Sequence, residues 1–321
     1  MTELAIHAAD RDIANELCEQ VRSAYHDRTP LRIVAGNTRA FYGRPVEGTE
    51  LNVAAHSGIV SYDPIELVVT VRAGTRLSAL NAALAEKHQM LPFEPPIFGD
   101  ASTIGGAVAT GMSGPRRPWA GAARDFVLGT RVITQEGKLL RFGGEVMKNV
   151  AGYDLSRMMA GAQGTLGVLA DISFKVLPIP TASHSLRLEM SLQDALAKLS
   201  ELGRQPLPIT AAAWHAGELF IRLEGGESSV KATKERLGGE ELSADFWQQL
   251  RDQQHGFFSL NEGQALWRLS LPPHTPALEL AVDESDIFYD WGGSQRWVKT
   301  ALPADTLRDA CQKAGGHATC Y

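Results

Sequence analysis

The chain of 321 residues predicts an α+β fold in two domains, and three features carry this prediction. Its length is about twice the ~150 residues of a typical single domain. Short apolar runs typical of strands alternate with amphipathic stretches typical of helices. The pattern also changes at Pro178 and Pro180, directly after an apolar strand. We therefore expect a first domain over residues 1–179 and a second over residues 180–321.

The first domain is expected to begin with a helix capped by Asp10, because Ile13, Leu17 and Val21 recur on one helical face. Apolar runs and a leucine stripe predict the remaining elements of this domain. They are strands at residues 31–35, 67–72 and 167–176, a helix over residues 77–84, and a hairpin joining residues 126–134 to 138–142.

In the second domain, Ser191 and Asp194 form a capping-box pattern that predicts a helix start. The further expected elements are strands at residues 218–224, 265–271, 287–291 and 295–300, and helices at residues 228–237 and 305–314. Five of the six tryptophans fall in this half, and we expect them in its core: Trp214, Trp247, Trp267, Trp291 and Trp297. This dense interleaving of strands and helices favours a compact α+β unit.

Composition excludes several classes of protein. The formal net charge is −6, and no concentrated basic stretch is present, so nucleic acid is not expected as a partner. Cys18, Cys311 and Cys320 have no metal or disulfide spacing, which favours a reduced, cytoplasmic protein. No run reaches the ~18 apolar residues of a membrane span. Membrane association is therefore expected only peripherally, through a partner.

Glycine is concentrated in one part of the chain, with 14 glycines among the 69 residues of 99–167. Glycine permits positive φ and a close approach of backbone N–H groups to anionic phosphates. Three glycine-rich segments fit that use, at residues 36–39, 102–114 and 161–167. None has the G-x-G-x-x-G or Walker pattern, so Rossmann and P-loop folds are disfavoured. Neither H-E-x-x-H nor G-x-S-x-G occurs, so zincin and α/β-hydrolase sites are also disfavoured.

The order of these motifs resembles the FAD-binding domain of the vanillyl-alcohol oxidase and p-cresol methylhydroxylase family. The resemblance covers roughly residues 10–177. It is carried by residues 33–43, 103–106, 119–125, 152–155 and 164–168. Within that family the chain is most similar to the FAD-binding subunits of bacterial glycolate oxidases, above all at residues 114–119 and 141–157.

The resemblance implies a two-part FAD-binding domain, followed by a smaller ferredoxin-like cap, and a set of residues that contact FAD. The first loop would hold the pyrophosphate through Gly36, Asn37, Thr38 and Arg39. The cradle would continue through Thr103, Gly105 and Gly106, the flavin would lie along Gly111, Ser113 and Gly114, and the adenine end would border Gly164, Gly167 and Val168. Many relatives have three glycines where this chain has Gly36, Asn37 and Thr38. Because threonine tolerates left-handed φ much less than asparagine does, the first loop is expected to bind somewhat differently.

Covalent attachment of flavin in this family uses a His or Cys near the isoalloxazine ring. Residues 91–157 contain neither, so we expect non-covalent FAD. Relatives in this family usually end with a segment that returns from the cap to the flavin. From the resemblance we expect the second domain of this chain to lack that segment.

The function implied by the resemblance is oxidation of glycolate, a 2-hydroxy acid, to glyoxylate within a complex. The partners would be a larger FAD-binding glycolate oxidase subunit and an iron–sulfur subunit. The cap histidines are far apart in sequence, which favours an electron-transfer or structural flavin subunit whose partner performs the chemistry. Two alternatives stay open: a self-sufficient FAD-dependent enzyme for another 2-hydroxy acid or alcohol, and a flavin-free scaffold.

Several charged residues in the glycine-rich part allow two interpretations. Arg116 and Arg117 could bind an anion, or could equally be solvated or face a partner subunit. Asp125 and Arg124 are expected to brace a loop. Lys148, Asn149, Tyr153 and Asp154 could touch flavin or a partner, but a packed tyrosine corner and a helix cap are favoured for the last two.

Overall fold

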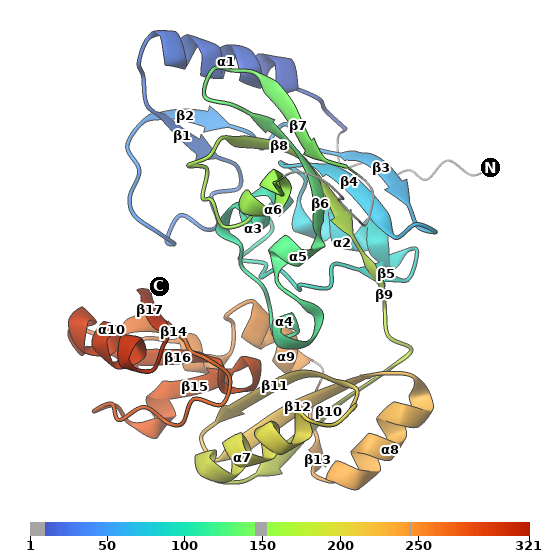
Figure 1. Ribbon diagram of the computed structural model, residues 1–321, viewed down its shortest axis with the longest axis vertical. Coiled ribbons are helices and arrows are strands. Elements are labelled where there is room, and N and C mark those ends of the chain that lie inside the picture. The colour runs from blue at the N-terminus through green and yellow to red at the C-terminus, as the bar shows by residue number, and fades with distance from the viewer. Residues whose placement is uncertain (1–9, 145–152, 244) are drawn as a thin grey trace. The chain divides into compact units, whose positions relative to one another are not determined.

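The computed structural model describes residues 10–144, 153–243 and 245–321 (Figure 1). The chain divides into two compact units. The first comprises Met1–Gly114 and Gly121–Ile179, and the second comprises Pro115–Ala120 and Pro180–Tyr321. The second unit therefore takes in a short segment, residues 115–120, from the middle of the glycine-rich part of the chain.

A five-stranded antiparallel sheet forms the centre of the first unit (Figure 1). Its strands, in spatial order, are β3 (Ile59–Asp63), β4 (Val68–Arg72), β8 (Val168–Lys175), β6 (Val127–Ile133) and β7 (Leu139–Gly143). The central strand β8 is buried along seven of its eight residues, including the polar Asp171 and Ser173. A separate parallel pair consists of β1 (Leu31–Val34) and β2 (Thr49–Asn52), and a short antiparallel pair consists of β5 (Gln89–Met90) and β9 (Leu177–Pro178).

Helix α1 (Ala14–His26) packs its apolar face into a core that includes residues of β2, β6 and β8. The expected cap is wrong: Asp10 pairs with Arg72, and Asp12 accepts the backbone N–H of Ala14 at 2.9 Å instead. The other helices of this unit are α2 (Leu77–Ala85), α3 (Ile104–Thr110), α5 (Ala123–Phe126) and α6 (Leu155–Met158). Helix α3 was not expected, because its start is rich in glycine.

The second unit contains an eight-stranded antiparallel sheet made of two halves that share one strand order. The first half orders its strands as β13 (Glu240–Glu241), β10 (Ala182–Glu189), β12 (Glu218–Gly225) and β11 (Ile209–His215). The second half orders its strands as β15 (Ile287–Asp290), β16 (Gln295–Thr300), β14 (Ala265–Ser270) and β17 (His317–Cys320). Read from the fourth strand, each half runs fourth, first, third, second, which is the ferredoxin-like order. The halves join where Trp214 pairs with Tyr289.

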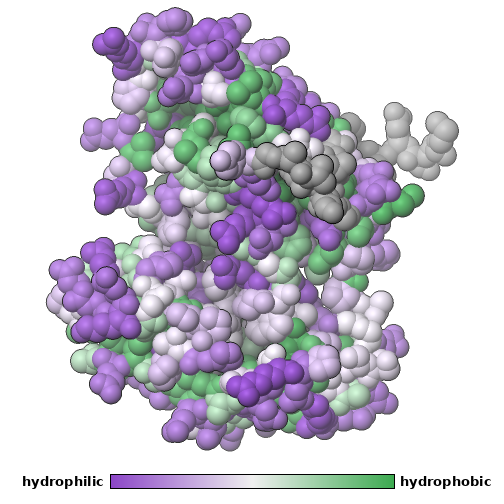
Figure 2. All heavy atoms as spheres, viewed as in Figure 1, coloured by the Kyte–Doolittle hydropathy of each residue, from purple (hydrophilic) through white to green (hydrophobic). Residues whose placement is uncertain are grey.

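Both faces of this sheet are covered by apolar side chains. On one face lie α7 (Leu192–Leu202), α8 (Glu227–Leu237) and α10 (Ala304–Lys313); on the other lie α9 (Asp245–Arg251) and the 3-10 turn η1 (Gly256–Phe258). The remaining short elements are α4 (Arg117–Ala120), η2 (Glu284–Asp286) and η3 (Trp291–Gly293). All five tryptophans predicted for the core are buried. On the face shown in Figure 2, hydrophilic side chains cover most of each unit, and hydrophobic residues reach the surface in separate patches.

The structure confirms the α+β class. It also confirms the capping pattern at the start of α7, where the Ser191 hydroxyl accepts the backbone N–H of Asp194 at 3.2 Å. Among the helices of the described residues, none is long and apolar enough to span a bilayer.

Candidate functional site

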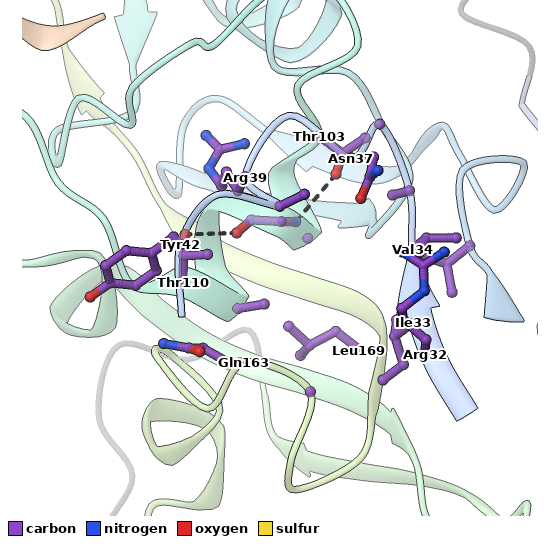
Figure 3. A pocket seen from close by; sticks show the side chains of 18 of the residues that line it. Arg32, Ile33, Val34, Asn37, Arg39, Tyr42, Thr103, Thr110, Gln163 and Leu169 are labelled. Carbon is purple, nitrogen blue, oxygen red and sulfur yellow. Dashed lines mark hydrogen bonds between the residues drawn. The ribbon is translucent and has the colours of Figure 1, made fainter. Parts of the chain in front are cut away.

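The first unit holds a cavity of about 410 Å³, walled by β1 and the loop after it, by α3, and by the segment before β8 (Figure 3). This volume falls within the roughly 300–1,000 Å³ of small-molecule and cofactor sites. Nine of the residues predicted to bind the cofactor line it: Gly36, Asn37, Thr38, Arg39, Thr103, Gly105, Gly106, Gly164 and Gly167.

The loop after β1 offers hydrogen-bond donors to this cavity. Within the described residues, the backbone N–H groups of Gly36, Asn37 and Thr38 have no acceptor. Asn37 has φ of 54°, a left-handed conformation that asparagine tolerates. Gly36 is needed for another reason, because a Cβ there would overlap the carbonyl oxygen of Ala101. Successive free N–H groups around a left-handed residue form a nest that binds anions.

The second glycine-rich segment has different backbone chemistry. Thr103 caps α3 by accepting the N–H of Gly106 at 3.2 Å, and the N–H of Gly105 donates to Ala73 at 2.8 Å. These amides therefore already have acceptors inside the protein. Gly105 and Gly106 instead leave part of the cavity wall without side chains, and the hydroxyl of Thr110 in the same wall donates to the carbonyl of Gly106 at 2.9 Å.

The third segment closes the cavity beside β1. Gln163 has φ of 49°, and its N–H donates to Ala109 at 2.8 Å. Gly164 has φ of 78°, and a Cβ there would lie 2.9 Å from the Ile33 side chain. Val168 begins β8, is buried, and does not appear among the lining residues.

The three residues predicted to lie along the flavin are also outside the cavity lining. Gly111 ends α3 with φ of 65°. The Ser113 hydroxyl accepts the N–H of Ala123 at 3.0 Å, and the N–H of Gly114 donates to the carbonyl of Phe93 at 2.9 Å. The structure thus brings residues 36–39, 103–106 and 164–167 together around one cavity, whereas Gly111, Ser113 and Gly114 do not line it.

The charge of the cavity is one-sided. Arg32, Arg39 and Arg44 line it, of which Arg32 is ion-paired with Glu50, and no Asp, Glu, His or Cys occurs among its described lining residues. The buried guanidinium of Arg39 donates to the carbonyl of Pro96 at 2.5 Å and lies 5.3 Å from the centre of the Phe98 ring. An excess of positive charge with free N–H donors fits a dianionic pyrophosphate, so the residues present suit FAD.

Sequence reasoning missed part of the wall. Tyr42, Arg44, Thr110 and Gln163 line the cavity, and Figure 3 labels Tyr42, Thr110 and Gln163. Gln163 lies within the third glycine-rich segment, where the glycines and not the glutamine carry the sequence signal. The signal for Tyr42 and Arg44 was their closeness in sequence to the first loop.

The structure decides several of the residues with two interpretations. Arg116 is 6% exposed and ion-paired, so the solvated alternative is wrong for it. Asp125 braces its loop by accepting the N–H of Ala122 at 2.8 Å. Asp154 caps α6 at the N–H of Arg157, as expected, whereas Tyr153 is 97% exposed rather than packed. Lys148 and Asn149 lie outside the described residues. In the part of the chain that the structure describes, no group of three or more His, Cys, Asp or Glu is placed to hold a metal ion.

Comparison with known proteins identifies the family. The FAD binding domain family matches residues 12–143. The glycolate oxidase subunit GlcE of Escherichia coli K12 is 56% identical over 308 residues, which are 96% of this chain and 87% of that protein. The chain belongs to the GlcE family of glycolate oxidase subunits. Membership of the GlcE family and the matched FAD binding domain confirm the resemblance inferred from the motifs.

More distant relatives match a smaller part of the chain. A D-lactate dehydrogenase of Anaerostipes hadrus is 33% identical over 199 residues, 61% of this chain and 41% of that enzyme. The glycolate oxidase subunit GlcD of Bacillus subtilis is 33% identical over 155 residues, 48% of this chain and 32% of that subunit. The chain thus spans less than half the length of these two relatives. Among solved structures, an alkyldihydroxyacetonephosphate synthase superposes with a TM-score of 0.71 over 94% of this chain and 70% of the synthase, at 15% identity, which shows a shared fold.

Proposed function

We propose that this chain is the FAD-binding, GlcE-type subunit of a multi-subunit glycolate oxidase. The observation that carries the proposal is 56% identity to GlcE across nearly the whole chain, together with a cavity suited to a dinucleotide. In the overall reaction the alcohol group of glycolate loses one hydrogen from carbon and one from oxygen and becomes the aldehyde group of glyoxylate. FAD, when bound, supplies an acceptor for the two electrons released.

The chain's own residues would bind and orient the cofactor. The free N–H groups of Gly36, Asn37 and Thr38 would hold the pyrophosphate, with Arg39 and the wall at Thr103, Gly105 and Gly106 beside it. By the family pattern, Gly111, Ser113 and Gly114 would follow the flavin, and Gly164, Gly167 and Val168 would border the adenine end. Attachment would be non-covalent, because residues 91–157, which the family pattern places near the isoalloxazine ring, contain neither His nor Cys.

The partners would be a larger, GlcD-type flavoprotein subunit and an iron–sulfur subunit that passes electrons toward the membrane, where the complex would associate peripherally. We propose that the GlcE-type chain transfers electrons or supports the complex, and that the larger subunit dehydrogenates the substrate. The names of the E. coli and B. subtilis relatives, subunits GlcE and GlcD of glycolate oxidase, support a complex with more than one kind of subunit.

Two measurements on purified protein test the proposal. The first is the visible spectrum, followed by acid precipitation: flavin bands that move into the supernatant are expected, and colour kept in the pellet would overturn non-covalent binding. The second compares glycolate-dependent reduction of a dye by the isolated chain and by the co-purified complex. Activity is expected only from the complex. Full activity of the isolated chain would favour the self-sufficient enzyme, and a colourless chain that cannot be loaded with FAD would favour the scaffold.

A further inference from the structure

A short strap leaves the first unit, is anchored in the second, and returns. The strap consists of residues 115–120, which group with the second unit although Gly114 and Gly121 on either side belong to the first. Four of its six residues form α4, and the N–H groups of Trp119 and Ala120 both donate to the carbonyl of Arg116 at 3.0 Å. Because these bonds stiffen so short a segment, a displacement at its centre reaches its ends.

The centre of the strap is held by buried charge. The Arg116 guanidinium lies 2.5 Å from the Glu224 carboxylate, and the two side chains are 7% and 11% exposed. Glu224 also accepts from Arg222 at 2.9 Å and from the Thr210 hydroxyl, so its position is fixed by two strands. The next residue, Arg117, lies 4.4 Å above the centre of the Trp291 ring. Replacing one member of a buried ion pair leaves the other charge buried without its partner, and lysine does not reproduce the planar geometry of the guanidinium.

The ends of the strap are held in the first unit. The N–H of Gly114 donates to the carbonyl of Phe93, whose fully buried ring stacks on Phe126 and Phe174. The Ser113 hydroxyl accepts the N–H of Ala123 at 3.0 Å, which ties the two chain segments together at the neck of the strap. Residues 111–114 thus lead directly into the strap, and the last of them, Gly114, is held to the core of the first unit through Phe93.

We propose that Arg116 is a positioning residue for the flavin-side loop, residues 111–114, and acts through its buried pair with Glu224. This inference rests on the proposed function in one respect, namely that the flavin follows this loop. The pair restrains the backbone on both sides of the strap, so FAD binding and anchorage of the strap favour each other. Coupling of this kind between two sites is reciprocal.

The test compares Arg116→Gln, Arg116→Lys and the matched control Arg124→Gln in the full chain. Arg124 lies near the strap in sequence, but its side chain is 67% exposed. The readouts are amide hydrogen exchange of residues 111–123 without FAD, the dissociation constant for FAD, and the visible bands of the bound flavin. For Arg116→Gln we expect faster exchange, shifted flavin bands and FAD affinity reduced roughly 5- to 150-fold, the usual span of coupling between sites. Arg116→Lys should recover part of each loss, and Arg124→Gln should match the wild type.

A folded Arg116→Gln protein with wild-type exchange and FAD affinity would overturn the proposal. If that variant does not fold, Arg116→Lys carries the test, because it keeps the buried charge while losing the guanidinium geometry. The exchange measurement needs no FAD. A wild-type chain that binds no FAD would therefore contradict the proposed function, and exchange alone would then decide whether Arg116 restrains the loop.

Discussion

The cavity of the first unit and the sheet of the second are built in opposite ways. The cavity depends on backbone: free N–H groups, a left-handed asparagine, and glycines that leave room for a neighbouring chain segment. The sheet depends on large side chains, with tryptophans and phenylalanines filling both of its faces. Substitutions in the first region should therefore change ligand binding most, and those in the second should change stability most.

The largest effect is expected from Trp214→Ala. Trp214 is fully buried where the two halves of the sheet meet; its indole N–H donates to Met190 at 3.1 Å, and its ring packs edge-on against Tyr289. Removing a buried tryptophan should lower the free energy of unfolding by roughly 3–5 kcal/mol. Urea unfolding followed by fluorescence measures this.

The control for Trp214→Ala is Leu260→Ala, an exposed position in the same unit, which should stay within about 0.5 kcal/mol of the wild type. The FAD dissociation constant of both variants should be unchanged. A Trp214→Ala protein that is folded but binds FAD weakly would break the contrast between the two regions.

The next effect is expected from Gly36→Ala. The added methyl group overlaps the backbone of Ala101, so the first loop must move and its N–H groups lose their common direction. Overpacking of this kind costs up to about 3 kcal/mol of folding free energy, and a loss of similar size in binding free energy would weaken FAD binding roughly 100-fold. A titration with FAD, followed by flavin fluorescence, measures it. In Gly256→Ala, where a Cβ would meet no atom within 4 Å, affinity should equal that of the wild type.

Gly36 and Arg116 show what the sequence could and could not predict. The place of Gly36, Asn37 and Thr38 in a tight loop beside the cavity was predictable from the residue types and the family resemblance, because left-handed φ and close approach are local properties of glycine and asparagine. The role of Arg116 did not follow, since its partner Glu224 is 108 residues away in sequence and nothing local marks the pair. Helix α3 was missed for a related reason: Gly105 and Gly106 lower helix propensity, but Thr103 supplies the cap that offsets them.

A smaller effect is expected from Ser191→Ala, which removes the side-chain cap of α7 in the second unit. The N–H of Asp194 then loses its acceptor, and the free energy of unfolding should fall by about 1 kcal/mol. Ser200→Ala, in the body of the same helix, serves as the control and should change stability little. Calorimetry of both variants with and without FAD gives the comparison. The loss should be the same in each condition, because the cap lies outside the cavity.

The smallest effect is a pH dependence centred on two imidazoles of the second unit. His215 and His255 lie 6.3 Å apart, ring centre to ring centre, among Phe246, Phe257 and Phe288. Burial lowers the pKa of each below its ordinary value near 6.5, and the neighbouring His215 lowers the pKa of His255 further. For His215, the hydrogen bond to the carbonyl of Ile287 opposes the lowering of the pKa, Lys299 adds to it, and Glu218 and Asp286 oppose it. A hydrogen bond from the backbone N–H of Phe257 to Nδ1 of His255 also requires that nitrogen to be unprotonated.

Folding lowers the pKa of both histidines. At a pH between the native pKa and the unfolded pKa of a histidine, the unfolded chain therefore binds more protons than the native protein. The stabilisation is therefore complete above pH ~6.5 and is lost as the pH falls below that value toward the native pKa values. The free energy of unfolding should decrease from pH 7.5 to 5.5, and the double variant His215→Gln, His255→Gln should lose part of that slope. His317→Gln, at an exposed position, should keep the wild-type slope. An identical slope in the double variant would mean that burial among these phenylalanines does not keep His215 and His255 unprotonated. Solvent would then reach between α9 and the sheet, and the second unit would be less firmly closed by side chains than the contrast with the first requires.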